Sequence, residues 1–227
     1  MNTYRGAAHE AGDSPALEDR VTRTEEFEAL YDAVPDPWNI SQRVSYYAIV
    51  WSWILGELRV KPQSVEDVGC GVGSFLLALK SVAPEIDAAG FEYSARAAES
   101  ARKLTGMKIR VGDIRQSAAF DTAAPCDLVI LNDVLTYLRD EWRPGLINCL
   151  RFLRPRHVVI SWSDSSDDWF PAYSNEVYTW TGGGARLYLV AHRTFDLPAD
   201  LGWAVCQRFA VYDVAYGCLA APMPAAR

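Results

Sequence analysis

Hydrophobic and polar positions repeat with a helical period over the first quarter of the chain. Residues 24–33 predict a short helix, which Pro35 and Pro37 end. A longer helix is predicted from about Ser41 to Leu58. Its apolar residues recur at three- and four-residue steps, at Val44, Ala48, Trp51, Leu55 and Leu58. The opposite flank is also apolar, so this helix needs cover on more than one side.

From Ser64 onward short β-branched runs alternate with helical stretches rich in Ala, Leu and Arg. Strands are predicted near 64–68, 87–92, 108–111, 127–131 and 157–162. Helices are predicted near 73–82, 94–104, 115–119 and 143–153. This alternation is typical of βαβ units with a mainly parallel sheet.

The last quarter of the chain departs from that alternation. Residues 185–195 and 204–216 predict two longer strands, with three consecutive glycines before them and Pro198 between them. An antiparallel pair at a sheet edge is expected. The predicted fold is therefore a doubly wound α/β domain, with a mainly parallel seven-stranded sheet and an antiparallel C-terminal edge. It is expected to span residues 23–227, after a disordered tail over 1–22.

Charge and cysteine content exclude several classes of function. The 227 residues carry a formal net charge of −7 and show no block of basic residues, which is unlike a nucleic-acid-binding protein. The five cysteines form no CxxC pair, so neither disulfides nor a metal site is indicated. A reducing cytoplasm suits them. No apolar run reaches the length of a membrane span, and the N-terminus lacks the order of a signal peptide.

The segment VEDVGCGVGSF, residues 65–75, predicts a buried strand, a glycine-rich turn and a helix start. The spacing GxGxG, with Ser74 in place of a further glycine, argues against the pyrophosphate-binding fingerprint of nicotinamide and flavin enzymes. Asp67 at the strand end is a candidate partner for the ammonium group of an amino acid. Alternatively, the glycines make only a tight turn.

Two further acids follow successive predicted strands. Glu92 ends the next strand, about 20 residues beyond the glycines, where ribose hydroxyls would need acceptors. Asp113 follows the third strand, where a carboxylate could accept from an adenine amino group while Ile114 packs against the ring. A single acid at a strand end is usually a solvated surface group, but three in succession indicate one adenosyl ligand.

These segments together, DVGCGVG, FE, GDI and DLVILNDVLTYL, resemble the motif series of class I S-adenosylmethionine-dependent methyltransferases. The resemblance covers about 64–161 and implies a Rossmann-like fold with S-adenosylmethionine as cofactor. It implies that Asp67, Gly69 and Gly71 hold the methionine end and Glu92 holds the ribose, with Gly73 as a further cofactor-binding residue. It further implies that Asp113 and Ile114 contact adenine, and that the backbone of Asn132 lies beside the sulfonium.

A narrower similarity, to nodulation-type small-molecule N-methyltransferases, comes from DPWN ahead of a long helix and VLTYL later in the chain. It implies N- or O-methylation of a small molecule in specialised metabolism. The chain departs from the class I pattern at Arg154-Pro155-Arg156-His157, where Pro-Gly-Gly is usual. It departs again over 182–195, the region that normally shapes the acceptor pocket.

Methyl transfer needs alignment in a dry pocket more than it needs a base. Candidate catalytic residues are Asp133, Tyr137 and Asp164, which follow strands four and five; helix capping is the alternative role. Candidate pocket or lid residues, whose alternative role is ordinary packing, are Trp38, Tyr46, Tyr47, Trp169, Tyr173 and Tyr178. His157 begins strand five at the opposite edge and is expected to be structural. His192 is a minor candidate, and His9 in the tail needs no role.

Two alternative functions remain open at this point. A cyclase would let the amino group of the ligand displace methylthioadenosine and close a small ring, and a non-catalytic module would bind the cofactor without turnover. The acceptor is expected to be a small molecule, with no nucleic acid and no membrane as partner. The apolar helix from Ser41 to Leu58 is expected to close the pocket or to form a homodimer contact.

Overall fold

The computed structural model describes residues 24–37, 39–163, 181–182, 184–196 and 206–217. Its helices are α1 (Thr24–Ala33), α2 (Val44–Glu57), α3 (Ser74–Val82), α4 (Ala95–Thr105), α5 (Val134–Leu138) and α6 (Trp142–Asn148). Its strands are β1 (Ser64–Val68), β2 (Asp87–Glu92), β3 (Lys108–Val111), β4 (Leu128–Asn132), β5 (His157–Ser163), β6 (Thr181–Gly182), β7 (Ala185–Asp196) and β8 (Cys206–Tyr216). Short 3₁₀ turns cover Ile40–Arg43, Ser117–Phe120 and Arg139–Glu141, and a π turn at Cys149–Leu153 continues α6.

All the strands belong to one sheet of order β3-β2-β1-β4-β5-β8-β7-β6. Strands β1 to β5 are parallel, whereas β8, β7 and β6 pair antiparallel. The predicted fold class is therefore confirmed. Among the described residues the sheet has one strand more than the predicted seven, because Thr181–Gly182 forms the two-residue β6.

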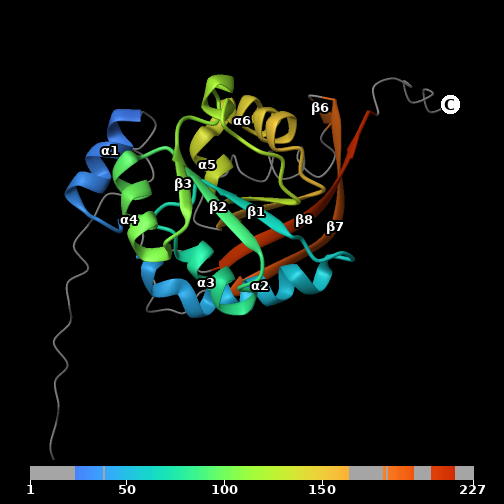
Figure 1. Cartoon of the computed structure of the whole chain (residues 1–227), viewed down its shortest axis with the longest axis horizontal. Coiled ribbons are helices and arrows are strands. Elements are labelled where there is room, and N and C mark those ends of the chain that lie inside the picture. The colour runs from blue at the N-terminus through green and yellow to red at the C-terminus, as the bar shows by residue number, and fades with distance from the viewer. Residues whose placement is uncertain (1–23, 38, 164–180, 183, 197–205, 218–227) are drawn as a thin grey trace, which may run out of the picture.

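The order of the strands reverses between β1 and β4, because the chain first winds outward to β3 and then returns to the other side of β1. Helices α2 and α3 cover one face of the sheet, and α5 and α6 cover the other (Figure 1). In open sheets of this kind ligands bind at the carboxyl ends of the strands beside the reversal. The topology therefore predicts a ligand site at the carboxyl ends of β1 and β4.

Helix α2 has apolar residues on both flanks, and the structure shows how each flank packs. Tyr46, Tyr47, Val50, Trp51 and Ile54 are buried, and the indole N–H of Trp51 donates to the Phe75 carbonyl oxygen of α3 at 2.8 Å. In the first stripe Trp51 and Leu58 are buried, while Val44, Ala48 and Leu55 are half-buried against the same core, so both flanks are covered, as the sequence predicted. The large aromatic rings fill the space over α3 better than Val44 or Ala48 would.

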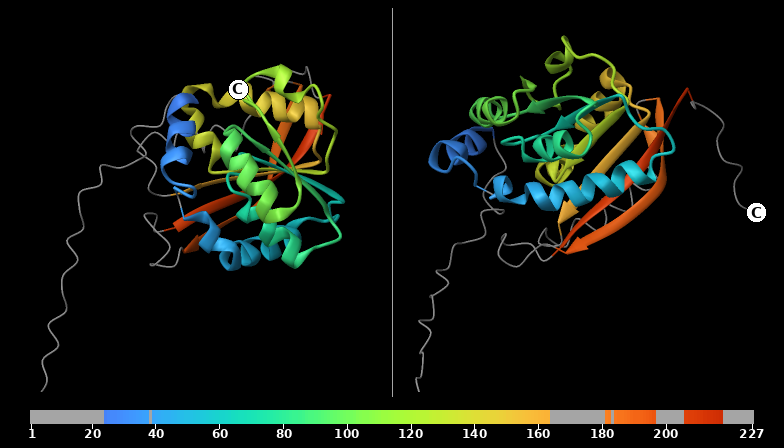
Figure 2. Two further views of the ribbon diagram at one scale, coloured as in Figure 1. Left: turned by 60° about the vertical axis from the view of Figure 1, so that its left-hand side comes forward. Right: turned by 60° about the horizontal axis from the view of Figure 1, so that its bottom comes forward.

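Helix α1 lies against the N-terminus of α4, as both views in Figure 2 show. The Glu28 carboxylate accepts from the Ala95 backbone N–H at 2.7 Å, and Asp32 forms an ion pair with Arg96. An acidic side chain at a helix N-terminus is favoured by the exposed N–H groups there. This contact holds α1 over the carboxyl edge of the sheet.

The turn before β5, where the sequence lacks Pro-Gly-Gly, is formed without glycine. Arg154 adopts φ 44°, in the left-handed region, and its guanidinium lies 4.6 Å from the centre of the Tyr216 ring. The Tyr216 hydroxyl donates to the carbonyl oxygens of Leu150 and Pro155. The contact with β8 therefore stabilises a conformation that normally needs glycine.

We expect Gly73→Ala to lower the free energy of unfolding by about 1–3 kcal/mol. Gly73 has φ 90°, and an added Cβ would lie 2.9 Å from Thr105 Cγ2 and 3.1 Å from Ala101 Cβ of α4. Gly106→Ala is the matched control, because Gly106 has φ 70° but open space around it. Chemical denaturation should show a smaller loss for the control, and equal losses would contradict the packing contribution.

Candidate functional site

A cavity opens at the carboxyl edge of the sheet, where the strand order reverses. Its walls come from the ends of β1, β2 and β4, the loop after β3, helix α1 and the turn before α2. Asp67, Glu92 and Asp113, the three acids singled out in the sequence, all line it. The structure thus brings together residues from three separate strand ends.

The glycine-rich loop forms the floor of the cavity. Gly69 and Gly71 line it with φ angles of 75° and 54°, which other residues adopt only with strain. The Gly71 N–H donates to Glu92 Oε2 at 2.7 Å, so the loop is fixed to the end of β2. A side chain at Gly71 would lie 2.9 Å from Ile40 and would enter the cavity floor.

The sequence predicts that Gly73 contacts the ligand, but the structure places Gly73 outside the cavity lining. It precedes α3, where its Cα faces Ala101 and Thr105 of α4. The close helix packing at this point requires the glycine. Its role in the structure is therefore to let α3 approach α4.

Asp67 is the most unusual group in the cavity. Its side chain is 1% exposed, and neither carboxylate oxygen has a hydrogen-bond partner among the described residues. Burial, together with the nearby charges of Glu92 and Glu66, raises the pKa of Asp67 to about 8. A buried carboxylate without a partner is costly, so the site favours a cationic ligand group at this position.

Glu92 is also buried, but backbone donors hold it in place. Its Oε2 accepts from the Gly71 N–H, and its Oε1 accepts from the Ser94 N–H at 3.0 Å. Burial raises the pKa of Glu92, and these backbone hydrogen bonds oppose the rise. Each oxygen can accept a second hydrogen bond, so the carboxylate suits a pair of vicinal hydroxyls.

Asp113 lines the cavity, but Arg115 occupies much of its hydrogen-bonding capacity. The guanidinium donates to both carboxylate oxygens, at 2.9 Å from Nε to Oδ1 and 2.7 Å from Nη2 to Oδ2. Ile114 is buried and also lines the cavity, beside Gly145 of α6. The sequence did not indicate the Arg115 pair, and contact of Asp113 with adenine stays a prediction.

The residues after β4 gather at the same edge. Asn132, Asp133 and Tyr137 all line the cavity, and Asp133 has φ 56°. Asp is one of the few residues that tolerate this left-handed conformation, and strain of this kind often accompanies a functional site. The roles predicted for these three residues are untested, but their position agrees with them.

The predicted aromatic pocket residues divide into three groups. Tyr47 lines the cavity, and burial raises its pKa to about 12. Tyr46 does not line it; its hydroxyl instead contacts Gln207 Oε1 at 3.5 Å. The remaining candidates, Trp38, Trp169, Tyr173 and Tyr178, lie outside the described residues together with Asp164.

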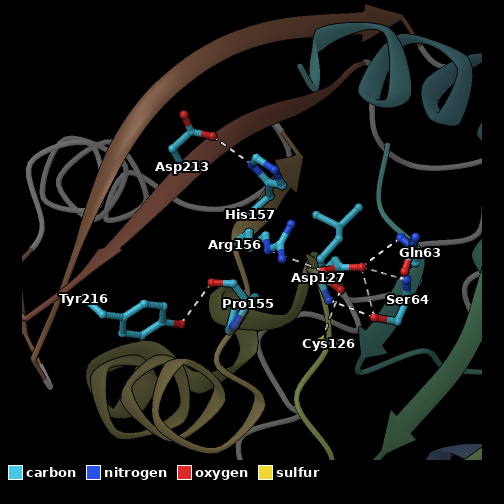
Figure 3. A network of polar contacts seen from close by, with 10 residues as sticks. Gln63, Ser64, Cys126, Asp127, Pro155, Arg156, His157, Asp213 and Tyr216 are labelled. Atoms are coloured by element: carbon cyan, nitrogen blue, oxygen red, sulfur yellow. Dashed lines mark hydrogen bonds and ion pairs between the residues drawn. The ribbon is translucent and has the colours of Figure 1, made fainter. Parts of the chain in front are cut away.

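His157 lies at the opposite edge of the sheet, as expected for a structural residue (Figure 3). Its Nδ1 is 2.8 Å from Asp213 Oδ1 on the neighbouring β8. Close by, Asp127 Oδ2 accepts from the backbone N–H groups of Gln63 and Ser64, which ties β4 to β1. His192 is exposed on β7 and does not line the cavity.

The sequence analysis missed several residues of the cavity. Arg43 lines it and is 3% exposed, and the aromatic residues Phe27, Tyr31 and Tyr93 complete the wall. One signal was present in the sequence, because Arg43 is the single charged residue between Asp36 and Glu57. The aromatic residues gave no such signal, since rings in the core follow the same periodicity.

Residues 65–156 match the family model described as "Methyltransferase domain". With the fold, this match confirms the resemblance of residues 65–156 to the methyltransferase domain of class I S-adenosylmethionine-dependent methyltransferases. The matched segment ends before β5. Helices α1 and α2 and the antiparallel strands lie outside it.

Solved structures with this fold share little sequence with the chain. A chain of the complex between the Haloferax volcanii Trm112 methyltransferase activator and a methyltransferase has TM-score 0.58 and 17% identity, covering 82% of this chain and 96% of that one. The plantazolicin methyltransferase BpumL, solved in complex with SAH, has TM-score 0.54 and 14% identity, covering 87% and 96%. The 16S rRNA methylase ArmA has TM-score 0.53 and 13% identity, covering 84% and 90%. The last two are named for different acceptors, plantazolicin and 16S rRNA, so the fold does not determine the acceptor.

We expect Asp67→Asn to stabilise the ligand-free protein increasingly as the pH rises from about 4 to 8. The unfolded carboxyl ionises near pH 4, whereas burial delays ionisation in the folded state, so the native protein loses stability through this pH window. The difference between variant and wild type should grow by at most about 1.4 kcal/mol per pH unit. Urea unfolding at several pH values measures it.

Asp113→Asn serves as the contrasting variant. It removes one side of the bidentate Arg115 pair, so it should destabilise the protein. A stability difference for Asp67→Asn that stays constant with pH would show that the Asp67 carboxyl ionises normally.

Proposed function

We propose that the protein binds S-adenosylmethionine in this cavity and transfers its methyl group to a small molecule. The observation that carries the proposal is the buried Asp67 carboxylate, which lacks a partner within the described protein and lies beside Glu92. A ligand with one ammonium group and neighbouring ribose hydroxyls satisfies both acids. When bound, S-adenosylmethionine supplies a methyl group activated by the sulfonium and leaves as S-adenosylhomocysteine.

The chain's own residues divide the work of holding this ligand. Asp67 binds the ammonium group, Glu92 accepts from the ribose hydroxyls, and Gly69 and Gly71 allow close approach of the backbone. The buried Arg43 supplies a cation for the carboxylate of the methionine moiety, since a guanidinium binds carboxylates with paired hydrogen bonds. Ile114 packs against the adenine ring and Asn132 presents its backbone near the sulfur.

The small-molecule acceptor is supported by charge and enclosure. The net charge of −7 opposes binding to a phosphate backbone. Phe27, Tyr31 and Tyr137 line the cavity from α1 and α5, and such rings favour a site with little water around the reacting groups. None of the helices in the described part of the chain has the length and apolar character needed to cross a membrane.

Identification of the nucleoside product tests the proposal directly. The protein is incubated with S-adenosylmethionine and a panel of small amines and alcohols, and the nucleosides are separated by mass spectrometry. We expect S-adenosylhomocysteine to accumulate only when an acceptor is present. Methylthioadenosine formed without an acceptor would show ring closure instead, and binding without any product would show a non-catalytic module.

Binding of S-adenosylhomocysteine should release close to one proton at about pH 7. Asp67 is mostly protonated in the ligand-free protein at this pH, and the ligand ammonium stabilises its charged form. Calorimetry in two buffers of different ionisation enthalpy measures the release, which should decline above about pH 8. Asp67→Asn should abolish it and weaken binding about tenfold or more.

Methylthioadenosine is the matched ligand, because it keeps the adenosine but lacks the amino acid portion. Arg43→Met should weaken S-adenosylhomocysteine about tenfold or more while leaving methylthioadenosine within about twofold. Equal losses for both ligands would show that Arg43 acts on the fold of the cavity rather than on the ligand carboxylate.

A further inference from the structure

A polar cluster at the ends of β4, β5 and β8 lies beside the part of the cavity assigned to the sulfonium. It consists of Asn132, Asp133, Ser161 and Gln207. None of the polar side chains in this cluster is needed for the nucleoside, the ammonium or the carboxylate of S-adenosylmethionine. The following inference rests on the proposed function and concerns the acceptor.

Gln207 is the centre of the cluster. It is 0% exposed and comes from β8, beyond the segment that matches the methyltransferase domain. Its side-chain amide nitrogen donates to Asp133 Oδ2 at 2.6 Å and to Asn132 Oδ1 at 2.8 Å. A buried amide fixed on two acceptors leaves the Asp133 carboxylate little freedom to rotate.

The backbone of Asp133 is held as firmly as its carboxylate. Its N–H donates to Ser161 Oγ at 3.0 Å, and the Ser161 hydroxyl donates to Asn132 Oδ1 at 2.6 Å. These bonds stabilise the left-handed conformation at φ 56°, which turns the residue toward the cavity that it lines. Two neighbouring strands, β5 and β8, therefore set the position of one carboxylate.

The roles of the other charged side chains in the cavity indicate that the Asp133 carboxylate faces the acceptor. Among the described residues, six charged side chains line the cavity, namely Arg43, Asp67, Glu92, Asp113, Arg115 and Asp133. Asp113 pairs with Arg115, Asp67 and Arg43 take the two charged groups of the methionine moiety, and Glu92 takes the ribose. Asp133 is the acid that remains for the second substrate.

Aromatic rings from α1, α5 and the end of β2 also line the cavity. Phe27 packs edge-to-face on Tyr137, with ring centres 5.6 Å apart, and on Tyr93 at 6.2 Å. Ring faces attract a cation without supplying a competing hydrogen-bond acceptor. A fixed carboxylate within an aromatic wall is a suitable environment for a substituted ammonium group.

We propose that the acceptor is an amine, that Asp133 binds its nitrogen, and that Gln207 is the positioning residue for Asp133. The bound ammonium first gives one proton to water, and the lone pair of the resulting neutral amine nitrogen then forms the bond to the methyl carbon. The carbon–sulfur bond breaks with its electron pair on sulfur, and the positive charge passes to nitrogen. The Asp133 carboxylate stabilises this charge as it develops, and the product ammonium then releases its proton to Asp133 or to water.

A hydroxyl acceptor fits the cluster less well. It would have to lose its proton to become a strong nucleophile, and the resulting oxyanion would lie beside the negative Asp133. The Gln207 amide nitrogen donates to Asp133 Oδ2, which fixes the carboxylate as a counter-ion for a positive charge. Among the described residues, Tyr46 and Tyr47 also interact electrostatically with Asp133, and Arg43 interacts with both tyrosines. The Tyr46 hydroxyl is 3.5 Å from Gln207 Oε1.

The experiment compares isosteric probes on protein saturated with S-adenosylhomocysteine. The pairs are 2-phenylethylamine with 2-phenylethanol, and hexylamine with hexanol, with binding measured by calorimetry and ligand-observed NMR. We expect each amine to bind at least about tenfold more tightly than its alcohol. Asp133→Asn should remove the preference and Gln207→Met, which keeps the side-chain volume, should reduce it about three- to tenfold.

A second measurement tests whether Gln207 positions the Asp133 carboxylate. The carboxyl carbon resonance of Asp133, assigned from its loss in Asp133→Asn, should shift in Gln207→Met, while affinity for S-adenosylhomocysteine stays within about twofold. His157→Gln, at the opposite edge of the sheet, is the control and should change neither the resonance nor the preference.

The outcomes separate the two proposals. Failure to bind S-adenosylhomocysteine overturns the proposed function and this inference together. When the nucleoside binds normally, three results overturn the amine acceptor alone. They are equal binding of alcohols and amines, no binding of either class, and an amine preference that persists in Asp133→Asn. A preference lost in Asp133→Asn but unchanged in Gln207→Met overturns the positioning role.

Discussion

Burial of the Asp67 carboxylate at the end of β1 limits which groups can surround it. Asp67 is 1% exposed, without a partner in the described protein, and another acid, Glu92, ends the adjacent strand. Such a pair opposes folding unless backbone donors, a raised pKa or a ligand compensates for the lost hydration. The structure uses the first two: Glu92 accepts from backbone N–H groups, and Asp67 has its pKa raised.

The site is assembled from the methyltransferase domain and from segments on both sides of it. The matched domain contributes the glycine-rich loop and the acids at the ends of β1 to β4. Helices α1 and α2, with the turn between them, add Arg43, Tyr47 and an aromatic cover, and β8 adds Gln207. The four acids that line the cavity thus lie in the matched segment, whereas Arg43, Tyr47 and Gln207 lie outside it.

The polar side chains at the amino edge of the sheet make different contacts from those at its carboxyl edge. At the amino edge, Asp127 binds backbone N–H groups of the β1 region and His157 pairs with Asp213, so neighbouring strands are held in register. These polar groups of the amino edge form hydrogen bonds with partners in the protein. At the carboxyl edge, Asp67 lacks a hydrogen-bond partner among the described residues and Asp133 has left-handed backbone geometry, two features that cost stability.

The sequence alone determined the strands, most helices, the parallel sheet with its antiparallel edge, and the placement of Asp67, Glu92 and Asp113 at successive strand ends. These features follow from local periodicity and from the rule that parallel strands present their carboxyl ends at one edge. The short α5, the more deeply buried flank of α2 and the role of Gly73 in helix contact were decided by tertiary structure. So were Arg43, Arg115 and Gln207, because each acts through a partner distant in sequence. A single glutamine in a strand looks the same in sequence whether it faces solvent or fixes a carboxylate, and only the pairing of β8 with β5 brings it to the site.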